Sequence, residues 1–248
     1  LSGTAISNFD VDALSDVAVF RPSTNIWYSL NSTNGAFQAV QFGAAGDKIV
    51  PGDYDGDGRT DQAVWRPSTG VWYVQRSSGG FAIVQFGSSG DIPVSGDYDG
   101  DLKSDVAVWR PSTGVWYILK SSDGGLDIRQ FGLASDKTAQ ADFDADGKTD
   151  IAVYRPADGT WYIWRSRDNG FSIFPFGLNG DRPVKGDYDG DGRADAAVYR
   201  PSNGVWYMLR STAGFGAVQF GIATDVPTPG DFDGDGKYDN AVYRDGAW

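Results

Sequence analysis

Short loops rich in aspartate hold the residues of this sequence that are best suited to chemistry. Five loops place Asp at positions 1, 3, 5 and 9, and four of these five have Gly at position 6. Alternate positions put short carboxylates on one side of the chain, and Gly permits the sharp turn that makes their oxygens converge. The predicted ligands are Asp53, Asp55, Asp57, Asp61, Asp97, Asp99, Asp101, Asp105, Asp142, Asp144, Asp146, Asp150, Asp187, Asp189, Asp191, Asp195, Asp231, Asp233, Asp235 and Asp239.

A sixth loop, nearest the N-terminus, keeps the spacing in a weaker form. Its predicted ligands are Asn8, Asp10, Asp12 and Asp16, and Ala13 stands where most loops have Gly. The loop of residues 97–105 has Leu102 at that position, where a positive φ is expected. We expect these two sites to be the weakest.

The ligand order is that of an EF-hand loop without the helix that follows it. Position 7 contributes its backbone carbonyl in such loops, here from Leu14, Arg59, Lys103, Lys148, Arg193 and Lys237. Hard oxygen ligands select Ca²⁺ or Mg²⁺, and many carboxylates in an open loop favour Ca²⁺. The sequence therefore predicts about six Ca²⁺ ions per chain, one for each loop.

Charge repulsion supports this prediction. Two like charges about 4 Å apart repel by about 1 kcal/mol in water and about 4 kcal/mol at an effective dielectric of about 20. The formal net charge is −12, and all acidic residues are Asp; six Ca²⁺ would cancel that charge. The alternative is a set of solvated Asp-Gly turns, since both residues favour turns in any case. The recurrence of the loop at fixed spacing favours the cation.

The loops belong to a tandem repeat. Asp47, Asp91, Asp136, Asp181 and Asp225 open successive copies at spacings of 44 or 45 residues, and each complete copy has a Trp-Tyr pair and a closing Phe-Gly. In the copy of residues 91–135, strands are predicted at 92–98, 106–110, 115–120 and 126–131. Four short strands with no helical period are typical of one β-propeller blade.

The predicted fold is therefore all-β, with residues 1–248 forming a single propeller domain. The repeats are 2–46, 47–90, 91–135, 136–180, 181–224 and 225–248, which gives five complete four-stranded blades and a partial sixth. A closed ring is the first expectation. The second is an open assembly in which the incomplete blade, with its exposed strand edge, pairs with a neighbouring chain.

Two further residues recur in each copy. An Arg follows the aromatic residue of the second strand, and a bidentate pair with the Asp that opens the copy is its expected role. The Trp-Tyr pair places its two rings on opposite faces of a strand. Packing between blades is the favoured role; the alternative is sugar stacking on Trp27, Trp72, Trp116, Trp161 and Trp206.

Composition excludes several classes of protein. The chain has no Cys and no His, so it has no disulfide, no thiolate nucleophile and no His general base. The net charge argues against nucleic acid as a partner, and no apolar stretch approaches the ~18 residues of a membrane span. Because the acids repeat identically, no residue set is unique enough to predict an enzyme.

The motif D-x-D-G-D-G-x-x-D followed by A-V, with Phe-Gly closing each unit, resembles the FG-GAP/VCBS repeat, which is related to the calcium-binding blades of integrin α-subunits. The resemblance implies a β-propeller with Ca²⁺ in the loop between the first two strands. Weak, open loops fill at extracellular millimolar calcium, so a secreted or cell-surface protein is expected. Three functions stay open: a non-catalytic adhesion or interaction module for a protein or glycan, a lectin, and a structural subunit of an extracellular fibre or tube.

Overall fold

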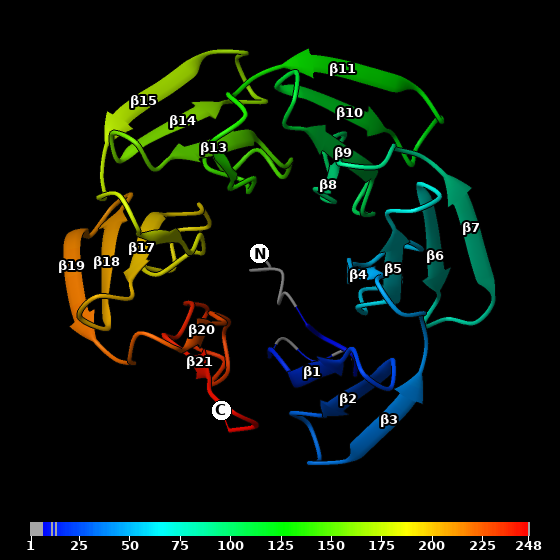
Figure 1. Cartoon of the computed structure of the whole chain (residues 1–248). Helices are drawn as coiled ribbons and strands as arrows, with labels where there is room; N and C mark the ends of the chain where they lie inside the picture. The colour runs from blue at the N-terminus through cyan, green and yellow to red at the C-terminus, as the bar shows by residue number, and fades with distance from the viewer. Residues whose placement is uncertain (1–6, 11, 13, 248) are drawn as a thin grey trace. The chain divides into compact units, whose positions relative to one another are not determined.

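The computed structural model describes residues 7–10, 12 and 14–247, and all regular structure among them is β (Figure 1). The first copy contains β1 (Val17–Arg21), β2 (Ile26–Leu30) and β3 (Phe37–Gln41). The next two contain β4 (Lys48–Ile49), β5 (Gln62–Arg66), β6 (Val71–Gln75), β7 (Phe81–Gln85), β8 (Ile92–Pro93), β9 (Val106–Arg110), β10 (Val115–Leu119) and β11 (Leu126–Gln130).

The last three copies repeat the pattern. They contain β12 (Lys137–Thr138), β13 (Ile151–Arg155), β14 (Thr160–Trp164), β15 (Phe171–Pro175), β16 (Arg182–Pro183), β17 (Ala196–Arg200), β18 (Val205–Arg210), β19 (Gly214–Gln219), β20 (Val226–Pro227) and β21 (Val242–Tyr243). Among the described residues there is no helix of the length and apolarity that a membrane span requires.

Each copy forms its own antiparallel sheet, with strands in sequence order. Four sheets have four strands, the sheet β1-β2-β3 has three, and β20-β21 has two. The first strand predicted for copy one lies in residues 1–6, outside the described residues. The sheets therefore correspond to the predicted propeller blades. The blade of copy one has three described strands, and the partial sixth blade has two.

The described chain divides into two compact units, one ending at Ala134 and one beginning at Ser135. The first contains the sheets of copies one to three, and the second contains those of copies four to six. We describe each unit by itself.

The first strands that the structure describes, in copies two to six, have only two residues each. In copy three the sequence predicts a strand over 92–98, but regular pairing covers only Ile92 and Pro93. The buried Val94 still donates its N–H to the carbonyl of Ala107, and pairing resumes only as an isolated bridge between Gly96 and Asp105. The segment therefore bends where it leaves the sheet to enter the acidic loop.

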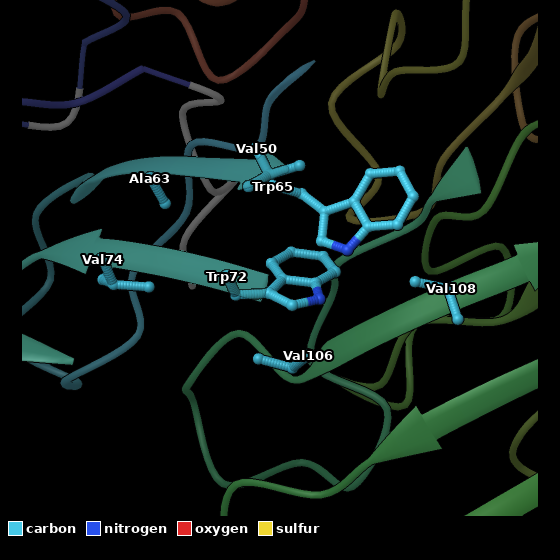
Figure 2. Close-up of a cluster of buried hydrophobic side chains, with 7 residues drawn as sticks. All are labelled: Val50, Ala63, Trp65, Trp72, Val74, Val106 and Val108. Carbon is cyan, nitrogen blue, oxygen red and sulfur yellow. The ribbon is translucent and has the colours of Figure 1, made fainter. Parts of the chain in front are cut away.

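The hydrophobic core of each unit lies between successive sheets. In the first unit, Trp65, Trp72 and Val74 of one sheet pack against Val106 and Val108 of the next (Figure 2). The strict alternation of buried and half-buried residues along β6 follows from the two-residue period of a strand. A four-stranded sheet cannot cover its own faces, so the neighbouring sheet supplies the burial.

The Phe-Gly motif is explained by the same packing. The indole N–H of Trp72 donates to the carbonyl of Phe86 at 3.0 Å, and the other four Trp-Tyr copies repeat this bond. Gly87 has φ +103°, and a Cβ there would lie 3.0 Å from Val108 of the next sheet. Only Gly adopts this conformation easily and leaves the space the neighbouring blade fills.

The repeated Arg has the predicted partner in five copies. Arg110 donates from Nε and Nη2 to the two carboxylate oxygens of Asp91 at 2.8 and 2.9 Å, and Asp91 is buried. The same bidentate pair joins Arg66 to Asp47, Arg155 to Asp136, Arg200 to Asp181 and Arg244 to Asp225. The hydrogen bond to Asp91 raises the pKa of Arg110. These pairs are structural and connect the start of each copy to its second strand.

Candidate metal centres in the acidic loops

The acidic loops lie between the first and second strands of their blades, as predicted. In copies two to six, an isolated bridge between the residue before position 1 and the acid at position 9 closes the base of the loop; in copy two these residues are Gly52 and Asp61. In five loops, three carboxylate oxygens lie within 4.8 Å of one another. The groups are Asp53, Asp55 and Asp57; Asp97, Asp99 and Asp101; Asp142, Asp144 and Asp146; Asp187, Asp189 and Asp195; and Asp231, Asp233 and Asp239.

The structure thus brings together three of the four predicted acids in each of these loops. Positions 1, 3 and 5 cluster in copies two to four, whereas positions 1, 3 and 9 cluster in copies five and six. The acid outside each cluster is Asp61, Asp105, Asp150, Asp191 or Asp235. The acids at positions 1 and 3 belong to the cluster in both arrangements.

The acid at position 1 holds the turn. Asp53 accepts the N–H of Gly56 at 2.6 Å and that of Gly58 at 2.8 Å. Asp97, Asp142, Asp187 and Asp231 make the equivalent pair of bonds in their own loops. Short side chains that bind the backbone a few residues ahead are the reason that Asp suits such turns.

The acid at position 9 connects the loop to the rest of its blade, and it is buried in copies one to five. Asp61 accepts the N–H of Tyr54 at 2.9 Å and that of Ser77 at 2.7 Å, one on each oxygen. The aromatic residue at position 2 packs on the core in copy two, where the hydroxyl of Tyr54 also donates to the carbonyl of Val50. Contacts of Asp61 at position 9 and Tyr54 at position 2 therefore hold the loop to its blade without an ion.

Hydroxyl residues in the turn between the third and fourth strands form a clasp that the sequence reasoning missed. In copy two, the hydroxyl of Ser77 donates to Asp57 at 2.7 Å and that of Ser78 donates to Asp55 at 2.5 Å. Similar bonds come from Ser32, Thr33, Ser121, Ser122, Ser166, Ser211 and Thr212. The repeated hydroxyl residue that follows each third strand was the available signal.

Unpartnered oxygens test whether the loops fit a cation. Asp144 is 8% exposed, and its Oδ1 has no hydrogen-bond partner; Arg167 lies 4.0 Å away. Oδ1 of Asp189 and Oδ1 of Asp10, at the same loop position, are also buried without a partner. A buried anionic oxygen without a partner is costly, and a bound cation would satisfy it. The donor set, all oxygen and mostly carboxylate, fits Ca²⁺.

Burial is the main cause of the raised pKa values among the loop acids, and neighbouring carboxylates add to it. Burial raises the pKa of Asp150 to about 6 and that of Asp195 to about 6, although backbone N–H groups stabilise both carboxylates. Burial and the neighbouring charges of Asp101 and Asp99 raise the pKa of Asp97. Burial of Asp191 acts to raise its pKa. Hydrogen bonds from the hydroxyls of Ser211 and Thr212 act in the opposite direction, and the pKa of Asp191 is lowered. The hydroxyl donors of the clasp therefore stabilise the charged form of this carboxylate.

Two loops carry backbone strain. Leu102 at position 6 has φ +68°, and Ala145 at position 4 has φ +57°, both in the left-handed region. The prediction that the copy-three loop needs a positive φ at Leu102 is confirmed. Copy one also differs, because the amide of Asn8 donates to the carbonyl of Asp12, and Ala13 lies outside the described residues.

The sugar-stacking prediction for the Trp residues is wrong. Trp72, Trp116, Trp161 and Trp206 are fully buried, and Trp27 is 5% exposed. Their indole N–H groups bind Phe-Gly carbonyls, and their burial leaves no ring face open to a sugar. The Tyr of each pair is half-buried instead, and the guanidinium of Arg110 lies over the ring of Tyr117 at 4.7 Å.

Comparison with solved structures shows the same fold at low identity. A streptogramin B lyase has a TM-score of 0.60 and 13% identity, covering 91% of this chain and 72% of the other. A virginiamycin B lyase from Staphylococcus aureus with quinupristin gives 0.62 and 12%, over 94% and 75%. An Agrocybe aegerita lectin specific for non-reducing terminal N-acetylglucosamine gives 0.59 and 16%, over 92% and 70%.

Comparison with protein families gives matches in the segments that contain the acidic loops. No curated protein matches the sequence. The model of the FG-GAP-like repeat matches residues 53–108 and 142–198. Each matched segment begins at position 1 of one acidic loop and ends within the second strand of the following copy. The two matches therefore identify FG-GAP-like repeats in this chain, as the D-x-D-G-D-G-x-x-D motif indicated.

Proposed function

We propose that this chain is a calcium-binding, non-catalytic interaction module that works outside the cell. The observation that carries the calcium assignment is the buried Oδ1 of Asp144, which has no hydrogen-bond partner inside a cluster of three carboxylates. Asp142, Asp144 and Asp146 would hold the ion in that loop, with the carbonyl of Lys148 as a further ligand. The ion would supply charge neutralisation and would fix the loop against its blade.

The proposed location follows from the kind of site. Half-exposed loops with several carboxylates bind calcium weakly enough to require the millimolar concentrations found outside cells. The non-catalytic assignment rests on the sequence, because every acid in the loops recurs from copy to copy. The lyases resemble this chain at 12% and 13% identity, so they support the fold only.

Metal analysis tests the calcium assignment. The protein is purified, stripped with chelator and dialysed against Ca²⁺, and the bound metal is measured by mass spectrometry. We expect about five or six ions per chain, a rise in melting temperature with Ca²⁺, and a smaller rise with Mg²⁺, which tolerates open sites poorly. A Ca²⁺ content below one ion per chain, with an unchanged melting curve, would contradict the proposal.

Glycan binding is the second candidate, at a position other than the Trp residues. A shallow pocket in the first unit is lined by Phe86, Ser88, Arg110, Tyr117 and Leu126, among others. Leu126 is 56% exposed, and the half-buried Tyr117 ring offers an apolar surface next to polar groups. The similarity to an N-acetylglucosamine-specific lectin, at 16% identity, supports the fold only, so the pocket lining carries this candidate.

A binding measurement separates the two candidates. Saturation-transfer NMR with N-acetylglucosamine in the presence of calcium should give a signal that Tyr117→Ala removes. Thr113→Ala, in the exposed turn between β9 and β10 and outside the pocket lining, serves as the control. If N-acetylglucosamine and a glycan array both give no signal with calcium-loaded protein, the lectin candidate is wrong.

A further inference from the structure

Neighbouring acidic loops in each unit are joined by a backbone hydrogen bond that recurs at the same position. The N–H at position 8 of one loop donates to the carbonyl at position 1 of the preceding loop. In the first unit, Thr60 donates to Asn8 at 2.6 Å and Ser104 donates to Asp53 at 2.5 Å. In the second unit, Ala194 donates to Asp142 and Tyr238 donates to Asp187, both at 2.6 Å.

The donor peptide also contains a proposed ligand. The peptide unit of Lys103 and Ser104 carries the N–H that binds Asp53 and the position-7 carbonyl proposed to bind the ion of its own loop. In a trans peptide the N–H and C=O point in opposite directions, and the described residues have no cis peptide. Fixing the N–H on the preceding loop therefore fixes the direction of the carbonyl.

The acceptor residue is equally tied to an ion site. Asp53 is the position-1 acid, its side chain holds the N–H groups of Gly56 and Gly58, and the next residue, Tyr54, donates to Asp61. An ion that orders this loop therefore orders the Asp53 carbonyl as well. Hydrogen bonds that follow one another in a chain polarise the peptide groups between them, so each bond strengthens the next bond in the chain.

Side chains reinforce the link. The aliphatic part of Lys103 lies so close to Gly56 of the preceding loop that a Cβ there would be 2.9 Å from its Cε. A Cβ added at Gly52 would lie 2.5 Å from the Ser104 hydroxyl. In copy four the equivalent of Gly52 is Ala141, and the facing residue is the small Ala194. Side-chain size on the two sides of the link is therefore matched.

From these contacts we propose that the acidic loops within a unit bind calcium with positive cooperativity, through the peptide that carries the position-7 carbonyl. The inference rests on the calcium-binding function proposed above. Loops of copies one, two and three form one linked set, and loops of copies four, five and six form the other. By linkage, the coupling acts in both directions along each set.

A steric wedge at the link tests the proposal. Gly52 is not in the positive-φ region, so Gly52→Ala adds a clash with Ser104 and leaves every ligand in place. The double variant Gly52→Ala, Ser104→Gly removes the clashing atoms and keeps the N–H donor. Ser104→Gly alone is the matched control.

The full chain is titrated with calcium and binding is followed by calorimetry. The amide NMR signals of Gly56 and Gly100 report separately on the loops of copies two and three. We expect a Hill coefficient above 1 for the wild type. Coupling free energies between sites usually correspond to about 5-fold to 150-fold in affinity. Gly52→Ala should therefore weaken both loops at least about fivefold, with recovery in the double variant.

Failure of the inference and failure of the proposed function give different results. If no calcium binds, the proposed function is wrong. If calcium binds but the two reporters titrate independently and Gly52→Ala changes nothing, only the coupling is wrong. Should Gly52→Ala not fold, the variant Asp55→Asn, Asp57→Asn replaces it: loss of one ion without a change in the affinity of loop three would overturn the coupling.

Discussion

Removing one charge from the copy-four loop should change stability in opposite directions with and without calcium. The perturbation is Asp144→Asn, which keeps the shape of the side chain. Carboxylate oxygens of Asp142, Asp144 and Asp146 lie within 4.8 Å of one another. Two charges at that separation repel by roughly 3.5 kcal/mol at an effective dielectric of about 20, and by more at shorter separations.

The net effect in chelator is smaller than two such repulsions. Relaxation of the loop lowers each repulsion, and the attraction between Asp144 and Arg167, at 4.0 Å, is lost. We therefore expect Asp144→Asn to stabilise the calcium-free protein by about 1–2 kcal/mol. In calcium at about 100 times Kd, a bound ion adds about 2.7 kcal/mol per site. The variant loses this increment and becomes less stable than the wild type.

The assay is urea unfolding followed by Trp fluorescence, in chelator and in calcium. Asp158→Asn is the control: it makes the same charge change in the same copy, in an exposed turn where the Asn oxygen can still accept the N–H of Thr160. The control should shift stability little in either buffer. If Asp144→Asn leaves stability in chelator unchanged or lower, and keeps the full calcium increment, the reasoning on charge strain is wrong.

Three further predictions follow from the strained and buried groups. Leu102→Gly should stabilise the protein by about 1 kcal/mol in thermal unfolding, since a side chain in the left-handed region costs roughly 1–2 kcal/mol and Leu102 is 78% exposed; a loss of stability would contradict the strain. In chelator, the free energy of unfolding should rise as the pH falls from 7 to 5. The pKa of Asp150 and that of Asp195 are each about 6 in the folded state, above the unfolded value, so the folded state binds more protons in this range. Over the same pH range calcium affinity should fall, and an affinity independent of pH would show that these acids are not coupled to the ion. Asp91→Ala should cost about 3 kcal/mol in urea unfolding, because it leaves the Arg110 guanidinium without its buried partner; a cost below about 1 kcal/mol would show that Arg110 finds another partner.

The sequence alone determined the repeat, the four-strand pattern and the position of the acidic loops. These features are local: a two-residue period marks a strand, and Asp and Gly at fixed spacing mark a loop, whatever packs around them. The pair between Arg110 and Asp91 was also predictable, because the same two residue types recur at one spacing in every copy. Leu102 was recognised from its position alone as the residue forced into a positive φ.

Only the tertiary structure decided which side of each strand meets another sheet. Alternation separates Trp116 from Tyr117 but does not say which ring is buried, and the Trp rings proved to be inside. The clasp of Ser77 on Asp57 and the bond from Ser104 to Asp53 join residues about 20 and about 50 positions apart, and they arise only when hairpins and blades stack. The physical reason is that a small sheet has two open faces, and the neighbouring sheet determines what each one contacts.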